Sequence, residues 1–229
     1  MLLKYYQKLD DAISYLSSSF CDEKKLINSI LGKKKIIYVD IGANQGSYIN
    51  YLSSFLNFKK IYAFEPIIEL NQKIKKNNPT LDIKIYNVAL SNLNKKRDFF
   101  QYKVSSQSSL YKQNNTFKSL MKLDKKIKVQ TKKFDSVFNN FKKIDFCKID
   151  VQGEDPNVLR GMKKHLAKKK IRLVKIEIIF ISLYINVEPN FYNILEFMKK
   201  NEYLLVSVSK IKFKNNKILF MDAFFEPTK

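Results

Sequence analysis

The chain has 229 residues, 45% hydrophobic and 14% aromatic, which is enough for a sizeable core and excludes a wholly disordered chain. Lys and Arg number 43 against 21 Asp and Glu, so the formal net charge is +22. No apolar run approaches the roughly 20 residues of a membrane-spanning helix, and the first residues lack the apolar region of a signal peptide, so we expect a cytoplasmic protein. Two cysteines, Cys21 and Cys147, and one histidine, His165, are too few for a disulfide framework or a zinc cluster.

Lysine carries almost all of the positive charge. Only Arg97, Arg160 and Arg172 are arginines, against 40 lysines. Arginine is the preferred residue for forked contacts to phosphate and guanine. Ile and Asn are plentiful while Ala and Gly are scarce, a skew typical of an AT-rich genome. We therefore expect no specific nucleic-acid binding and only weak association with anionic surfaces; a selected polyanion-binding surface is the alternative.

Hydrophobic periodicity predicts a helical extension followed by one domain. Residues 1–31 have apolar side chains at helical spacing, which predicts one or two amphipathic helices. These pack on the sheet, cover a substrate or form a dimer contact. Over 32–229, strands and helices alternate, which predicts a mostly parallel sheet with helices on both faces and an antiparallel edge. Strands are expected at 36–41, 60–64, 83–88, 127–132, 146–151, 173–180, 204–208 and 218–224, and helices at 47–55, 67–76, 134–141, 156–168 and 191–200. The polar stretch 91–126 is expected to be the least regular part.

Glycine is rare in this chain, so its five positions are informative. Gly42 and Gly46 lie in the segment VDIGANQGSY, directly after the first predicted strand and before the first predicted helix of the domain. We expect both to be required by backbone geometry, because a Cβ there would keep a ligand from the backbone N–H groups. The spacing is neither the dinucleotide fingerprint nor that of a phosphate-binding loop.

Two carboxylates accompany this loop. Asp40 ends the first strand, and Glu65 ends the next, where an acid can accept both hydroxyl groups of a ribose. Two carboxylates without a phosphate-binding lysine suit a ligand with a cationic sulfonium and an amino group. The glycine spacing alone is also that of a tight turn, but the combination indicates S-adenosylmethionine (SAM).

With these motifs in place, residues 36–224 resemble the FkbM-type methyltransferase family. The resemblance rests on VDIGANQGSY, AFEP, NVALS (87–91), QSSL (107–110) and KIDVQGE (148–154); Glu202 departs from the family's glycine. It implies a Rossmann-like class I methyltransferase fold with seven strands. It also implies O-methylation, typically of a sugar hydroxyl on a glycan, glycolipid or secondary metabolite. The cofactor contacts it implies are Asp40, Gly42, Ala43, Asn44, Gly46, Glu65, Pro66, Asn87, Ala89 and Asp150.

Methyl transfer to a hydroxyl needs alignment of the reactants and a positioned base or a metal ion. Asp150 lies at the end of the strand at 146–151 and is the candidate base or metal ligand; the alternative role is a structural acid that holds the loop. Glu154 is a weaker candidate, because an acidic residue near a helix N-terminus commonly serves only to interact with the helix dipole. Glu177 pairs with Lys175 or Lys148, or acts at the site.

Other residues have simpler expected roles. We expect His165 to be solvated and Cys147 to be a small core residue. Ser108 and Ser109 line an acceptor pocket or belong to a polar loop.

Three functions remain open at this point. The first is SAM-dependent O-methylation of a carbohydrate-containing acceptor. The second is methylation of RNA or DNA, which suits the charge of +22 but lacks a base-flipping motif. The third is a non-catalytic SAM-binding scaffold.

Overall fold

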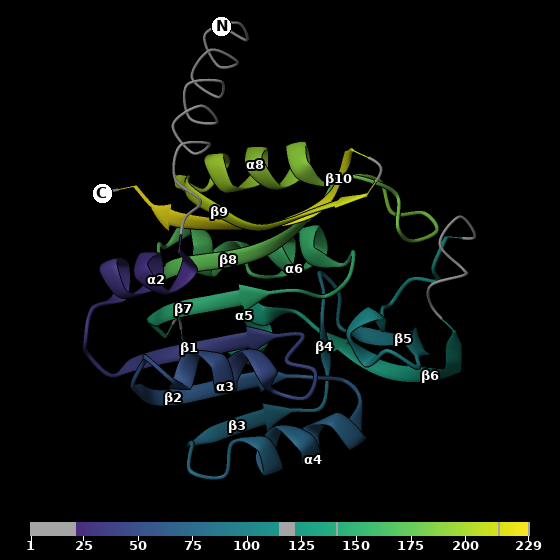
Figure 1. The fold of residues 1–229 in the computed structure, drawn as a ribbon, viewed down its shortest axis with the longest axis horizontal. Helices are drawn as coiled ribbons and strands as arrows, with labels where there is room; N and C mark the ends of the chain where they lie inside the picture. Colours follow the sequence, from purple (N-terminus) through teal and green to yellow (C-terminus); the bar gives the residue numbers. More distant parts are fainter. Residues whose placement is uncertain (1–21, 115–121, 141, 215, 229) are drawn as a thin grey trace, which may run out of the picture.

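A computed structural model describes residues 22–114, 122–140, 142–214 and 216–228 (Figure 1). Its centre is a seven-stranded sheet of order β3-β2-β1-β7-β8-β10-β9. The first five strands are parallel, β10 is antiparallel to β8, and β9 forms the edge beside β10. The strands are β1 (Ile36–Ile41), β2 (Phe58–Phe64), β3 (Ile83–Tyr86), β7 (Ile144–Ile149), β8 (Ile171–Ile179), β9 (Tyr203–Lys214) and β10 (Lys217–Pro227). This arrangement confirms the predicted class I fold, with the antiparallel strand one place in from the edge.

Helices cover both faces of the sheet (Figure 1). They are α2 (Glu23–Leu31), α3 (Ser47–Ser53), α4 (Ile68–Asn77), α5 (Phe134–Val137), α6 (Asp155–Gly161), α7 (Lys163–Ala167) and α8 (Phe191–Lys200). On one face, α2 and α3 pack with Tyr38 and Phe146 in one apolar cluster, to which α2 contributes Ile27 and Leu31. On the other face, α5 to α8 pack against Val39 and Ile149. The part of the predicted extension before residue 22 lies outside the described residues.

A second, three-stranded sheet lies beside the ends of the central strands (Figure 1). It has the order β4-β6-β5 and consists of β4 (Ala89–Leu90), β5 (Lys95–Tyr102) and β6 (Leu123–Lys132). Its long strands β5 and β6 are antiparallel. The prediction that 91–126 would be the least regular part is therefore wrong for β5. Only Phe99 and Tyr102 of that strand are buried, so its sequence is too polar to show a core pattern.

The single helix predicted at 156–168 is two helices, α6 and α7, and the side chain of Asp135 caps the first turn of α7. Its carboxylate accepts the backbone N–H of Lys164 at 2.9 Å and that of His165 at 3.3 Å. These are N–H groups that the first turn of a helix leaves without a partner. Against expectation, His165 is fully buried: its Nδ1 lies 2.5 Å from Asp135 Oδ1 and its ring packs edge-on against Phe134. Cys147 is a buried core residue, as expected.

Among the residues that the structure describes, no helix combines the length and the apolar character needed to cross a membrane.

Candidate functional site

The loop after β1 is held in a conformation that glycine permits. Gly42 and Gly46 have φ angles of 79° and 81°. A Cβ on Gly42 would lie 2.0 Å from the backbone oxygen of Asp150, and one on Gly46 would lie 2.8 Å from Asn78 Nδ2. Both glycines are therefore required by contacts within the protein. This differs from the predicted reason, which was the approach of a ligand.

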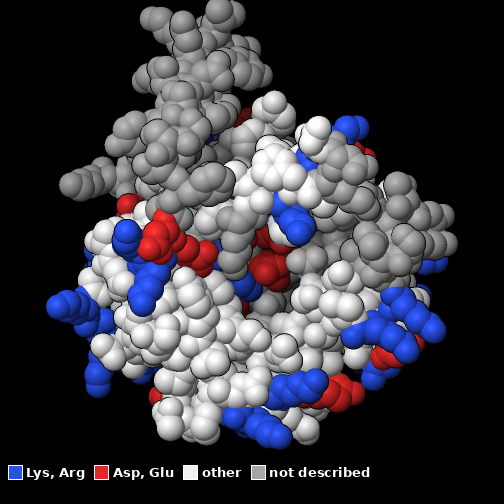
Figure 2. Space-filling model, in the orientation of Figure 1, with Lys and Arg blue, Asp and Glu red and all other residues white. Residues whose placement is uncertain are grey.

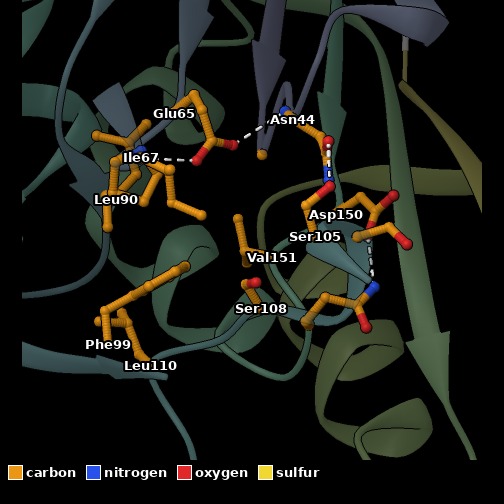
Figure 3. Close-up of a pocket in the computed structure, with 15 residues that line it drawn as sticks. Asn44, Glu65, Ile67, Leu90, Phe99, Ser105, Ser108, Leu110, Asp150 and Val151 are labelled. Atoms are coloured by element: carbon orange, nitrogen blue, oxygen red, sulfur yellow. Dashed lines mark hydrogen bonds between the residues drawn. The ribbon is translucent and has the colours of Figure 1, made fainter. Parts of the chain in front are cut away.

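Glu65, at the end of β2, is tied to this loop. Its two carboxylate oxygens accept backbone N–H groups, Oε2 from Asn44 and Oε1 from Ile67, each at 2.9 Å (Figure 3). Burial raises the pKa of Glu65 to about 7, although these two hydrogen bonds oppose the shift. A carboxylate offers about four lone-pair positions, so each oxygen can still accept a hydroxyl hydrogen.

A cavity lies between the carboxyl ends of the central strands and the second sheet. The volume open to the centre of a water-sized sphere is about 80 Å³, within about 600 Å³ of empty space that includes open solvent at the mouth. The apolar side chains of Ile67, Leu90, Phe99 and Leu110 lie on one side, with Asp150 opposite them (Figure 3). The remaining lining residues are Gly42, Asn44, Glu65, Pro66, Ala89, Ser105, Ser106, Ser108, Val151 and Gln152.

Asp150 is held by neighbours on both oxygens. Lys148 Nζ lies 3.4 Å from its Oδ2 and 3.3 Å from Asp40 Oδ1, and Gln152 Nε2 donates to its Oδ1 at 2.9 Å. Burial alone would raise the pKa of Asp150, but Lys148 and Gln152 lower it below its usual value. Asp40 and Lys148 occupy paired positions on β1 and β7, which confirms that these strands are neighbours.

Glu177 does not line the cavity itself, but it contacts Gln152, which does. Its Oε2 accepts the second N–H of the Gln152 amide at 3.0 Å. Burial, and next the nearby charge of Asp150, raise the pKa of Glu177 well above its usual value. The predicted pairing with Lys148 or Lys175 is replaced by this amide contact; Lys175 instead pairs with Glu23 and Asp222.

The structure brings six predicted cofactor residues to the cavity: Gly42, Asn44, Glu65, Pro66, Ala89 and Asp150. The other four do not line it, namely Asp40, Ala43, Gly46 and Asn87. Asp40 and Ala43 are buried in the core, and Asn87 donates to the backbone oxygens of Glu65 and Pro66.

Of the predicted catalytic residues, only Asp150 lines the cavity. Glu154 is fully buried, and its Oε1 is contacted by Arg97 and by the Ser91 hydroxyl, each at 2.5 Å. Ser108 lines the cavity as expected, whereas the Ser109 hydroxyl donates to the Gln152 carbonyl at 2.7 Å. No group of three or more His, Cys, Asp or Glu side chains among the described residues is arranged to hold a metal ion.

Sequence reasoning missed the wall that the second sheet and its loop supply. Phe99 comes from β5, and Ser105 from the short 3₁₀ helix η1 (Ser105–Gln107). The Ser105 hydroxyl lies 3.0 Å from Asn44 Oδ1, so this loop reaches the loop after β1. The sequence offered no clear signal for this wall, because the two buried residues of β5, Phe99 and Tyr102, are three positions apart and do not alternate as in a half-buried strand.

The cavity has a charge opposite to that of the chain. Its lining includes two carboxylates, Glu65 and Asp150, and no Lys or Arg among the described residues. Figure 2 shows acidic side chains inside a hollow on this face, with most Lys and Arg side chains near the outline. A site of this charge favours cationic or neutral ligands and disfavours phosphate.

Comparisons with known proteins agree with this fold. The chain is similar to the ribosomal protein L11 methylase of Lactobacillus delbrueckii subsp. bulgaricus, with a TM-score of 0.53 and 9% identity over 90% of this chain and 77% of that one. It is also similar to an rRNA methylase of Streptococcus thermophilus, with a TM-score of 0.51 and 11% identity over 90% of this chain and 94% of that one. At such identities the likeness shows the fold alone.

Sequence comparisons give the family. The chain is 26% identical over 156 residues to the 2-O-methyltransferase NoeI of Sinorhizobium fredii, a match that covers 63% of this chain and 64% of that protein, slightly less than two thirds of its length. The family model described as the methyltransferase FkbM domain matches residues 40–205, which contain the loop after β1, Glu65, Asp150 and Glu177. The chain therefore belongs to the FkbM methyltransferase family.

Proposed function

We propose that the protein methylates a hydroxyl group of a carbohydrate-containing acceptor that is uncharged where it meets the site. The observation that carries this proposal is the cavity lining, which contains two carboxylates and no Lys or Arg among the described residues. An acceptor phosphate would lie near the Asp150 carboxylate with no Lys or Arg among the described lining residues to contact it, since Lys148 lies behind Asp150 and is shared with Asp40. The similarity to a 2-O-methyltransferase supports oxygen as the acceptor atom.

The residues present fit SAM. Glu65 has a free lone pair on each oxygen for the two ribose hydroxyls, and its two backbone partners fix its orientation. Ile67, Leu90, Phe99 and Leu110 offer an apolar wall for the flat adenine ring (Figure 3). Bound here, SAM supplies a methyl group on a positively charged sulfur.

Asp150 is placed to assist the acceptor. It ends β7 at the carboxyl edge of the sheet and lines the cavity, and 34% of its side chain is exposed. Lys148 and Gln152 keep its carboxylate ionised and oriented, so that it can accept the hydroxyl proton.

The test is transfer of label from methyl-labelled SAM to a panel of neutral glycans, glycolipids, sugar nucleotides and RNA, with Asp150→Asn as the inactive control. We expect label in a neutral carbohydrate. Label that appears only in RNA would favour the nucleic-acid alternative, for which the charge of +22 is the supporting observation. Binding of SAM without transfer to any acceptor of the panel would contradict the proposed acceptor class.

A further inference from the structure

The side-chain amide of Gln152 joins the two carboxylates at the polar side of the cavity. Its Nε2 donates to Asp150 Oδ1 at 2.9 Å and to Glu177 Oε2 at 3.0 Å, and its Oε1 accepts the Tyr184 hydroxyl at 2.7 Å. A reversed amide would place its oxygen against two carboxylates. The surrounding charges therefore fix the direction of this amide.

The backbone of Gln152 is held as firmly as its side chain. Its φ angle is 56°, in the left-handed region that a residue with a long side chain rarely adopts. The Ser109 hydroxyl donates to its carbonyl oxygen at 2.7 Å. Such strain persists only where surrounding contacts impose it, and it is typical of functional sites.

Carboxylates outnumber lysines around this amide. Lys148 lies between Asp40 and Asp150, at 3.3 and 3.4 Å, while Glu177 is contacted by the neutral amide. The pair Asp150–Glu177 therefore has one lysine contact for two carboxylates. Glu177 is buried and Asp150 is partly exposed, and two neighbouring carboxylates in such a setting resist ionising together, as in sites where two acids share one proton.

We propose that Gln152 is a positioning residue that holds Asp150 and Glu177 as one proton-sharing pair, whose proton content follows the charge of the bound ligand. Beside a sulfonium both carboxylates are ionised, and beside a neutral thioether the pair holds one proton. The pair thereby prefers SAM to its demethylated product. This inference rests on the proposed function, because it takes these two molecules as the ligands.

The pKa values of the pair agree with this arrangement. Burial and then Asp150 raise the pKa of Glu177, while Lys148 and Gln152 keep the pKa of Asp150 below its usual value against the effect of burial. Several further charged groups face the pair from the elements around it: Asp40 on β1, Asp155 on α6, Lys175 on β8, Asp222 on β10 and the Tyr184 hydroxyl. A ligand cation lowers the proton affinity of the whole group, and its loss raises it.

The proton balance of the reaction follows from this coupling. The O–H bond of the acceptor breaks as the new C–O bond forms, and the proton passes to a carboxylate oxygen of Asp150, the member of the pair that lines the cavity. The electron pair of the broken C–S bond stays on the sulfur, which becomes neutral. The sulfur loses its positive charge and the carboxylate pair gains one proton, so the total charge of the site is unchanged.

Calorimetry tests this without an acceptor. SAM and S-adenosylhomocysteine are titrated at pH 7 in two buffers of different ionisation enthalpy, which gives the protons exchanged on binding. We expect SAM to release up to about one proton more than S-adenosylhomocysteine. Because Glu65 would contact the ribose of either ligand, its contribution cancels in this difference.

Two variants separate the parts of the proposal. In Glu177→Gln the difference in proton release should disappear, and the preference for SAM should fall about tenfold or more, because one charge within about 12 Å at an effective dielectric constant of about 20 contributes at least that much. In Gln152→Met the difference should move to higher pH, since Asp150 and Glu177 both lose a donor. Glu196→Gln removes an equal charge from the exposed face of α8 and should change neither quantity.

Each part has an outcome that overturns it. Equal proton release by the two ligands in the wild-type protein would overturn the proton-sharing pair. Unchanged pH dependence in Gln152→Met would remove Gln152 as its positioning residue. Absence of binding by both ligands would instead contradict the cofactor site, and with it the proposed function.

Discussion

Glu65 and Asn44 join the ends of two neighbouring strands: the Asn44 N–H donates to Glu65 Oε2 at 2.9 Å. Asn44 has a φ angle of 51°, which Asn tolerates better than most residues, and this conformation directs its N–H toward β2. The carboxylate that the ribose would meet is thereby oriented by the loop that follows β1. Burial raises the pKa of Glu65 to about 7, so its charge changes within the physiological range.

Binding of S-adenosylhomocysteine should therefore weaken as the pH falls. Below about pH 7 the free protein holds a proton on Glu65, and the carboxylate must lose it to accept both ribose hydroxyls. We expect the Kd to rise up to about tenfold per pH unit below that value. Glu65→Gln should bind about 1–3 kcal/mol more weakly at pH 8, and its Kd should vary less with pH. Calorimetric titration between pH 5.5 and 8.5 measures both, and a Kd of the wild-type protein that does not change with pH would contradict this role of Glu65.

Gly42 and Gly32 form a matched pair for the glycine loop. Both have positive φ angles, 79° and 72°, but a Cβ on Gly32 would meet nothing within 4 Å, whereas one on Gly42 would lie 2.0 Å from the Asp150 backbone oxygen. Gly32→Ala should therefore cost only the conformational term, about 1–3 kcal/mol of unfolding free energy, because its ψ angle of −166° places it in a region that glycine almost alone adopts.

Gly42→Ala should lose a further 1–3 kcal/mol, roughly the cost of overpacking, together with most SAM affinity, because relieving the clash moves Asp150 or Asn44. Denaturant unfolding and SAM titration of the two variants measure these effects. Equal losses of stability would show that the contact with Asp150 is unimportant.

Local sequence patterns were enough to predict β1, the glycine loop and Glu65. Strands buried on both faces are continuous apolar runs, and glycine is required where φ is positive. The second sheet was not predicted, because β5 pairs with β6 across 20 or more intervening residues and leaves most of its side chains at least partly exposed. The apolar wall at Phe99 depends on that pairing.

Side-chain direction explains the remaining differences at the site. Ala43 lies in the loop between Gly42 and Asn44, yet it points into the core while both neighbours line the cavity. Asn87 faces the backbone oxygens of Glu65 and Pro66. A sequence motif places these residues near the cavity but does not give the direction of each side chain.

The ion pair of Arg97 and Glu154 attaches the second sheet to α6. Arg97 Nη1 lies 2.5 Å from Glu154 Oε1, and its guanidinium lies over the Tyr111 ring. Arg97→Ala leaves the fully buried Glu154 without its cation, which should cost about 3 kcal/mol of unfolding free energy. The double variant Arg97→Met/Glu154→Gln should recover much of this loss. Thermal and denaturant unfolding measure it, with the exposed Lys96→Ala as control; an Arg97→Ala loss no larger than that of the control would contradict a structural role for the pair.

Asp150 and Asp40 share Lys148 but differ in access to the cavity. Asp150 lines it, whereas Asp40 is fully buried. Asp150→Asn keeps the size of the side chain and removes the proton acceptor, so turnover at saturating SAM should fall about 10²–10⁴-fold with little loss of stability. Asp40→Asn should do the opposite, because it removes a charge from the buried contact with Lys148: about 1–3 kcal/mol of unfolding free energy is lost, and turnover at saturating SAM changes less than about tenfold. With an acceptor from the labelled-SAM panel, single-turnover rates and Tm of both variants decide the matter. Near-normal turnover in Asp150→Asn would place the proton acceptor elsewhere, with Glu177 the next carboxylate to replace.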